Sequence, residues 1–405
     1  MNLSARPQKN FDTERFLACA IAAAALWYVA LCLVGYLSQR PLWNDEECVL
    51  RSLKAFNVQQ MFGAELAADQ VFPRAYLFLI QQLAKPFHFH LLLLKLLPLL
   101  SMLLAFFLWI KIARDEFTDK AQLLTFVLSW PASAVLIYYA SELKQYSMDV
   151  LVAAVFLRFI CYRERPENTK RDLKDTVLLI SLPFLGFFSY IAFLFALILF
   201  YDLCVAAFNG KTARRRVVLY GVSLLTVCLL SYFFDMRYRH ASVVTKGFHD
   251  YFISFDSLPE FLKTLGEGTN NLFSRWFVER PKILKMIGVF FVTFGLLYLF
   301  AWFFKDIRKD RYRLKSVHTI AFFLFLGLFL LGTLKLYPFT VPRTSLFFCP
   351  IVLFLTIKGI AAVKNINGWI YRIIHAAYFV FLIFLMIALS RVTFAGQLTF
   401  RPVLW

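Results

Sequence analysis

Charged side chains are scarce in this chain of 405 residues, since Asp, Glu, Lys and Arg together make up only 17% of it. A soluble globular domain carries about 25%. Glycine is also infrequent, with 15 residues, and no glycine-rich phosphate-binding loop occurs. These shortages argue against a soluble globular enzyme, a disordered chain, an ATP-driven pump or a soluble nucleotide-sugar fold within this chain.

Cysteine and histidine give no sign of a metal site. The seven cysteines lie mostly in apolar segments, and no pair has the spacing of a CxxC motif, so neither a disulfide framework nor a thiolate metal site is expected. His88 and His90 have no carboxylate at ligand spacing beside them. We therefore predict no metal and no other cofactor.

Apolar residues are abundant, at 60% of the chain with 48 Phe. They form blocks of about 20 residues, the length that an α-helix needs to cross a bilayer. The sequence predicts an all-α polytopic membrane protein with eleven transmembrane helices, at 16–37, 91–110, 121–139, 146–160, 175–189, 190–207, 217–234, 283–304, 316–336, 344–362 and 370–390.

The segment 72–87 is also apolar, but it is short and contains Arg74 and Lys85. If it does not cross, the basic segments at 111–120, 158–174, 208–216, 305–315 and 358–372 all fall on the side of the basic N-terminus. Because basic loops favour the cytoplasmic side, we predict a juxtamembrane or re-entrant helix at 72–87. The N-terminus is then cytoplasmic and the C-terminal tail lies outside.

The net charge of +19 is accounted for mainly by these inner segments, so no nucleic-acid partner is predicted. The chain forms one transmembrane domain over 1–405, with outer loops at 38–71 and 235–282. Within the second loop, apolar residues at helical spacing predict an interfacial helix that breaks at a hinge, Gly266–Gly268. This helix fits a lid or a plain amphipathic anchor equally well.

An acidic cluster follows the first span, in the sequence LWNDEE. Asp45 or Glu46 is a candidate general base for an acceptor hydroxyl, because neighbouring carboxylates repel and raise a pKa. A solvated acidic turn beside an interfacial Trp is the alternative.

A second cluster, YYASELKQY over 138–146, joins two predicted spans at the same face. Lys144 is a candidate to neutralise a phosphate, and Glu142 to orient it or bind an acceptor. The alternative is an aromatic belt with an ion pair.

A third cluster, YPFTVPR over 337–343, precedes another span. Arg343 offers a fork of donors to a phosphate, or it simply anchors a helix end.

In the segment 72–87, Arg74 and Tyr76 either face the site or belong to an amphipathic anchor. Lys95, near the outer end of its span, is expected to snorkel.

These motifs together resemble a family. The chain looks like the C-type (GT-C) membrane glycosyltransferases that use polyprenyl-phosphate sugars, near the protein O-mannosyltransferase and lipid A aminoarabinose transferase group, glycosyltransferase family 39. Asp45-Glu46 matches the acidic pair after the first span of that family. Tyr138 to Tyr146 aligns with an outer turn close to YYSQEARMY, with Lys144 in place of Arg. Phe72 to Tyr76 is similar to a PPLYY segment, with Arg74 in place of Pro, and Tyr337-Pro338-Phe339 with Arg343 is similar to a late segment.

The resemblance implies an inverting glycosyltransferase that moves a sugar from a polyprenyl-phosphate donor to an acceptor hydroxyl outside the membrane, in the inner membrane of a bacterium. Asp45 is then the base with Glu46 as substitute, and Glu142 positions the acceptor or the basic residues. Lys144, Arg343, Tyr337 and Tyr146 bind the departing phosphate. The acceptor is a glycan, a lipid or a protein. The alternatives are a transporter or flippase of lipid-linked glycans, and a glycan polymerase or ligase.

Overall fold

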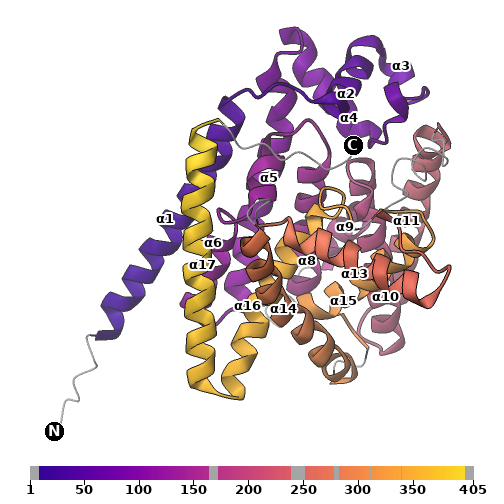
Figure 1. The fold of residues 1–405 in the computed structure, drawn as a ribbon. Coiled ribbons are helices and arrows are strands. Elements are labelled where there is room, and N and C mark those ends of the chain that lie inside the picture. Colours follow the sequence, from indigo (N-terminus) through magenta and orange to yellow (C-terminus); the bar gives the residue numbers. More distant parts are fainter. Residues whose placement is uncertain are drawn as a thin grey trace.

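The computed structural model describes residues 9–163, 172–238, 251–277, 282–309, 312–314, 316–338 and 340–396. Parts of the predicted outer loop (239–250 and 278–281) and Phe339 lie outside these ranges. Within them the chain forms helices and no strand (Figure 1). The helices are α1 (Lys9–Leu37), α2 (Asn44–Ala55), α3 (Val58–Met61), α4 (Arg74–Ala84), α5 (Leu91–Glu116), α6 (Lys120–Ser129), α7 (Ala134–Tyr138), α8 (Tyr146–Arg163), α9 (Asp172–Ser181), α10 (Ile191–Phe208), α11 (Arg214–Phe234), α13 (Leu258–Ser274), α14 (Lys282–Lys309), α15 (Val317–Thr333), α16 (Cys349–Ala362) and α17 (Gly368–Phe394).

Seven stretches of the described residues are helical, long enough and apolar enough to cross a bilayer. They confirm the prediction of an all-helical, multi-pass membrane protein. A bent pair, α6 with α7, makes an eighth if it counts as one span. The segments Asp175–Phe187 and Val317–Thr333 are apolar but shorter. The seven stretches are Thr13–Leu37, Leu91–Glu116, Ile191–Phe208, Arg214–Tyr238, Lys282–Lys309, Leu346–Asn365 and Gly368–Phe394.

The predicted continuous span at 121–139 is broken in the structure. The chain bends by 62° between α6 and α7, beside Pro131, which lacks an N–H and clashes with the preceding turn of a helix. Ser133 Oγ donates to the Trp276 carbonyl over 2.7 Å, and Ala134 N donates to the Phe277 carbonyl over 3.1 Å. These bonds satisfy backbone and side-chain polar groups that the break would leave unpaired in an apolar surrounding.

Aromatic rings fill the core beside this break. The Tyr28 ring lies 4.6 Å from that of Phe106 and 5.4 Å from that of Trp130, and the Tyr28 hydroxyl donates to the Leu136 carbonyl over 3.0 Å. Helix α1 is thereby held against α5 and α7. On its other side α1 lies against α17, where Trp27 Nε1 donates to Ser390 Oγ over 2.9 Å (Figure 1).

Helices α14 and α16 approach so closely that only glycine fits between them. A Cβ atom on Gly295 would lie 2.6 Å from Thr356 N, and one on Gly359 would overlap the Phe294 carbonyl. Small residues at such crossings let helix backbones approach in membranes, where packing replaces the hydrophobic effect as the main attraction.

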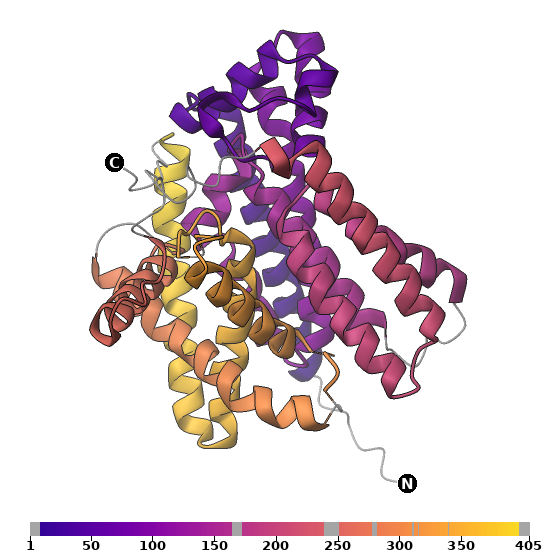
Figure 2. The same cartoon turned by 90° about the vertical axis from the view of Figure 1, so that its right-hand side faces the viewer.

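Ion pairs place basic residues from three of the five predicted inner segments at one end of the bundle. Lys120 pairs with Glu14 at 3.0 Å, which places the start of α6 beside the first turns of α1. Lys358 pairs with Glu116 at 3.5 Å, and Arg158 pairs with Asp115, so the ends of α16 and α8 meet the end of α5. Helices α2, α3 and α4 lie at the opposite end of α1 (Figures 1 and 2).

Helix α4 has 11 residues, a length of about 16 Å, and is therefore too short to cross a core of about 30 Å. It turns Tyr76, Ile80 and Gln81 inward and leaves Leu79 and Leu83 exposed. Its place relative to the membrane surface stays a prediction.

Helix α13 does not break at Gly266–Gly268, so the predicted hinge is wrong. A Cβ on Gly268 would lie 2.6 Å from Thr340 Cγ2. This glycine serves close packing of α13 against the segment 337–343.

Candidate functional site

The acidic cluster lies in the first turn of α2, where a helix dipole favours negative charge. Glu46 is fully buried. Its Oε1 accepts a bond from Leu143 N over 2.6 Å, and its Oε2 accepts bonds from Arg40 Nη1 over 3.1 Å and Trp43 N over 3.3 Å. Glu46 therefore connects the start of α2 to the segment 138–146.

Asp45 connects the same turn to the segment 337–343. Arg343 Nη1 donates to Asp45 Oδ2 over 2.8 Å, and the Asp45 side chain keeps 25% of its exposure. The Arg343 guanidinium also lies over the Trp43 ring, 5.4 Å from its centre. Two segments almost 300 residues apart in sequence thus meet at one carboxylate.

Gln70 links Asp45 to Lys144. Its Oε1 accepts a bond from Lys144 Nζ, and its Nε2 donates to Asp45 Oδ1 over 3.5 Å. The turn before it contains Ala68 with φ 54°, a left-handed conformation rare for a residue with a side chain. Ser52 Oγ holds this turn by accepting a bond from Ala67 N over 2.9 Å, so the chain holds Gln70 in place at some conformational cost.

Glu142 is the least satisfied group of the cluster. It is 1% exposed, and neither carboxylate oxygen has a hydrogen-bond partner among the described residues. Burial, reinforced by the charge of Glu46, raises the pKa of Glu142 to about 7, although Arg40, Arg343 and Lys144 act in the opposite direction. Burial also lowers the pKa of Lys144, against the attraction of Asp45.

Arg40 completes the cationic side. One nitrogen binds Glu46, the guanidinium lies 4.3 Å from the centre of the Tyr138 ring, and Nε and Nη2 are buried without a partner. Lys95 Nζ donates to the Arg40 carbonyl over 2.7 Å. The expectation that Lys95 snorkels towards the lipid surface is wrong, because its side chain is 1% exposed and points inward.

The two candidate tyrosines lie at the edge of this cluster. Tyr146 is buried with its ring edge-on to Tyr139 at 5.4 Å, within reach of the charges of Arg343 and Glu142. The Tyr337 hydroxyl donates to the Thr344 carbonyl. Tyr337 therefore braces the segment that carries Arg343.

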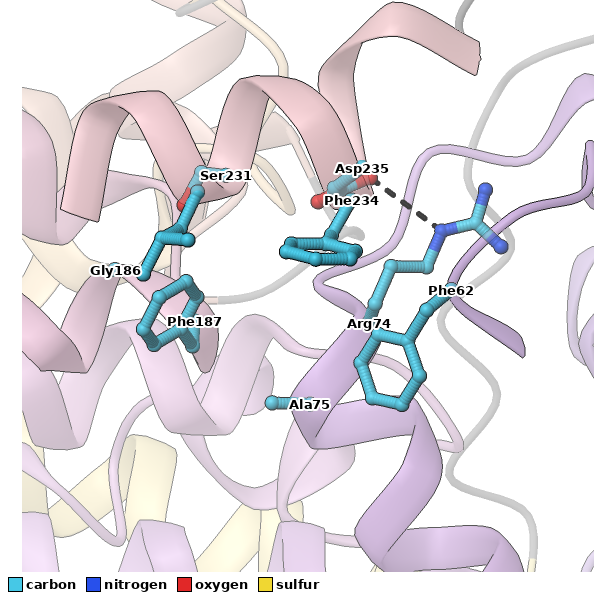
Figure 3. A pocket seen from close by; sticks show the side chains of 9 residues that line it. Phe62, Arg74, Ala75, Gly186, Phe187, Ser231, Phe234 and Asp235 are labelled. Atoms are coloured by element: carbon cyan, nitrogen blue, oxygen red, sulfur yellow. Dashed lines mark hydrogen bonds and ion pairs between the residues drawn. The ribbon is translucent and has the colours of Figure 1, made fainter. Parts of the chain in front are cut away.

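Arg74 faces a different partner (Figure 3). Its Nε lies 3.4 Å from Asp235 Oδ1, and its other nitrogens donate to the carbonyls of Met61 and Ala64 over 3.3 and 2.9 Å. Asp235 also accepts a bond from the Tyr190 hydroxyl over 2.6 Å. These bonds hold the loop before α4 against the end of α11. Within the described residues, Arg74 forms no hydrogen bond to the Asp45 cluster.

Tyr76, the other candidate on α4, is fully buried and stacks on Phe72 at 5.7 Å. Phe72 in turn lies 6.0 Å from Lys144 Nζ. Tyr76 thus supports the cluster through a ring contact.

Two pockets flank the cluster without including it. One, of about 290 Å³, is mainly apolar and lies between α4, α11 and the turn at 182–187, beside Arg74 and Asp235 (Figure 3). The other, of about 380 Å³, lies between α2 and the start of α5, beside Glu47, Arg51 and Lys54. Asp45, Glu142, Lys144 and Arg343 line neither of them.

No known protein family, curated protein or solved structure matches this chain. Among the described residues, no group of three or more His, Cys, Asp or Glu side chains is placed to hold a metal ion. The site is therefore interpreted from its own geometry.

Two residues of the site, and a further buried carboxylate on α8, were not predicted from the sequence. Arg40 and Gln70 belong to no recognisable motif, and only the fold brings them to Glu46 and Lys144. Asp149, on α8, is buried and accepts a bond from Ser189 Oγ over 2.6 Å. A carboxylate inside a predicted span was a signal for that residue.

Proposed function

We propose that this protein is an inverting glycosyltransferase that moves a sugar from a polyprenyl-phosphate donor to an acceptor hydroxyl. The observation that carries the proposal is the meeting of three separate segments at one buried cluster of charges. Asp45 pairs with Arg343, Gln70 joins Asp45 to Lys144, and Glu46 binds the backbone beside Glu142. A membrane anchor needs no such convergence of carboxylates and cations, which are costly to bury.

In this proposal Asp45 takes the proton of the acceptor hydroxyl as the acceptor oxygen bonds to the anomeric carbon. The bond from that carbon to the phosphate oxygen breaks on the opposite face, and its electron pair leaves with the polyprenyl phosphate. Arg343 and Lys144 stabilise the negative charge that grows on the phosphate. Tyr146 donates a hydrogen bond to the phosphate, whereas Tyr337 acts by bracing Arg343.

A lipid phosphate that binds Arg343 competes with Asp45 for the same guanidinium. Their 2.8 Å pair occupies the carboxylate, and transfer of Arg343 to the phosphate leaves the carboxylate free to accept a proton. Glu46 makes three hydrogen bonds and is fully buried. It suits a positioning role better than that of a substitute base.

The proposal includes a C-type fold with eleven spans, a cytoplasmic N-terminus and the site on the outer face of a bacterial inner membrane. The gathering of basic segments beside the start of α1 supports this orientation. The acceptor is a glycan, a lipid or a protein exposed on that face.

A transporter of lipid-linked glycans is the second candidate. The pockets beside the cluster are compatible with lipid passage. The Asp45 cluster, however, lies beside α2 at one end of the bundle (Figure 1), whereas transporters bind near the bilayer midplane. A polymerase or ligase would use related phosphate chemistry on longer glycans.

The purified protein should be given radiolabelled polyprenyl-phosphate sugars, with simple alcohols and glycans as acceptors. The proposal predicts release of polyprenyl phosphate and a product with inverted anomeric configuration by NMR. Release with retained configuration would contradict it. Movement of intact donors across proteoliposomes without release would favour the transporter.

A further inference from the structure

The cluster contains buried donors and acceptors that find no partner within the protein. Both oxygens of Glu142 are unpaired acceptors, and Nε and Nη2 of Arg40 and Nε1 of Trp43 are unpaired donors. Buried polar groups are nearly always hydrogen-bonded, and an unpaired one destabilises the fold. Several such atoms within one charged cluster therefore point to a bound polar molecule.

These atoms belong to neighbouring side chains. Glu46 contacts both sides, since it accepts bonds from Arg40 and Trp43 and from the backbone next to Glu142. The charges of Arg40 and Glu142 act on each other, yet the two side chains form no ion pair. Arg40 is held in place instead by Glu46 and the Tyr138 ring.

The chemistry of this set selects hydroxyl groups. A hydroxyl donates one hydrogen bond and accepts others, so a molecule with adjacent hydroxyls satisfies the carboxylate and the three donor atoms together. Arg40 attracts a carboxylate that Glu142 repels, and Glu142 attracts an ammonium group that Arg40 repels, so a charged substituent gains no net attraction from this pair. The unpaired atoms thus fit a neutral sugar better than a uronic acid or an amino sugar.

We propose that Glu142, Arg40 and Trp43 form the subsite for the transferred sugar, and that this sugar is neutral, with adjacent free hydroxyls. The inference rests on the proposed function and narrows its substrate class. Glu142 accepts bonds from two hydroxyls, while Arg40 and Trp43 donate to hydroxyl oxygens. The phosphate lies beyond them, at Lys144 and Arg343.

The test separates the sugar from the phosphate. The affinity of the full-length protein is measured for polyprenyl phosphate alone and for polyprenyl phosphates bearing a neutral hexose, an amino sugar or a uronic acid. Wild-type protein should bind the neutral donor about tenfold or more tightly than either charged one. Glu142→Gln should weaken binding of the neutral donor about tenfold and reduce the penalty on the uronic acid. It should not weaken binding of bare polyprenyl phosphate, because it removes a negative charge beside Lys144 and Arg343.

Glu47→Gln is the matched control, because Glu47 is an exposed carboxylate on the same helix turn as Asp45. It should change none of the four affinities. The sugar subsite would be overturned if Glu142→Gln lost as much affinity for bare polyprenyl phosphate as for the sugar-bearing lipid. A wild-type protein that bound a charged sugar more tightly than the neutral one would also overturn it. Neither result would touch the proposed function, which fails instead if no donor of any kind releases its sugar.

Discussion

At the scale of single residues, Glu142 shows how burial and neighbouring charges shift the pKa of a carboxyl group. Its pKa lies near 7 in the folded protein, against 4.5 for an ordinary glutamate. Between these two pH values the unfolded chain loses a proton that the folded protein keeps. The free energy of unfolding therefore falls as pH rises through this window, by at most about 3 kcal/mol, and it is insensitive to this group above pH 7.

Glu142→Gln removes this titration. The variant should gain thermal stability relative to the wild-type protein as the pH rises from 4.5 to 7, by several degrees, because Gln carries no charge to desolvate. Differential scanning fluorimetry in detergent at a series of pH values measures the difference. The exposed Glu47→Gln should give a flat difference. A flat difference for Glu142→Gln as well would mean that Glu142 titrates normally.

The three carboxylates of α2 show what a local sequence pattern does not predict, namely the different surroundings of adjacent acidic residues. The sequence predicted Asp45 and Glu46 as site residues, but adjacent acidic residues look alike in a motif. In the structure Asp45 pairs with Arg343, Glu46 is buried against Leu143 N, and Glu47 is exposed. These differences depend on segments far away in the chain, which no local pattern contains.

At the scale of elements, α13 controls the segment that carries Arg343. Gly268→Ala would place a methyl group 2.6 Å from Thr340 Cγ2, so we expect a loss of about 1–3 kcal/mol in stability and weaker donor binding. Adding Thr340→Ser removes that methyl group and keeps the hydroxyl that binds the Tyr251 carbonyl over 2.7 Å. The double variant should recover both properties, as measured by thermal unfolding and donor affinity.

Gly266→Ala is the control on the same helix, since nothing lies within 4 Å of its added Cβ. It should be neutral or slightly stabilising, because alanine favours helices over glycine by about 1 kcal/mol. If Gly266→Ala and Gly268→Ala had the same effect on stability and donor affinity, the contact between α13 and Thr340 would not determine the position of the segment that carries Arg343.

The crossing of α14 and α16 gives a second prediction. Gly359→Ala would drive a methyl group into the Phe294 backbone, which yields only if the two helices separate. We expect a steep loss of folded protein by size-exclusion chromatography. Gly327→Ala should be mild, because its Cβ meets only the flexible end of Leu194 at 2.9 Å. Similar yields of folded protein for both variants would show that α14 and α16 have room for a methyl group at their crossing.

Elements were predictable from apolar length, and their interruptions were not. All the predicted spans contain helix, because a long apolar run in lipid must satisfy its backbone internally. Among the described residues, however, only seven stretches, or eight with the bent pair α6 and α7, are long and apolar enough to cross a bilayer. The break near Pro131 depends on partners at Trp276 and Phe277 that accept its freed bonds. Conversely, Gly266 and Gly268 suggested a hinge, yet α13 continues because Gly268 fits against Thr340.

At the scale of the whole molecule, the short helix α4 decides the orientation of all that follows. In the proposed topology α4 does not cross, so alkaline phosphatase fused after residue 64 and after residue 90 should be active in both cases. A fusion after residue 118 should be inactive, because α5 crosses and its end meets the basic segments. Opposite results at residues 64 and 90 would show that 72–87 spans the membrane and would reverse the predicted topology.

Apolar length made the all-helical, multi-pass architecture predictable, whereas the orientation indicated by the basic segments stays a prediction. The site was predictable only as candidates on one face. Its cohesion depends on Gln70, Arg40 and Lys95, whose contacts arise when α2, α4 and α5 pack together.

The most direct test of the central claim is the single-turnover transfer rate of Asp45→Asn with a polyprenyl-phosphate sugar. Asparagine retains the size of the side chain but cannot take a proton. The account predicts a rate about 10²- to 10⁴-fold below that of the wild-type protein, with the donor still bound. A variant that transferred sugar at the wild-type rate would contradict it.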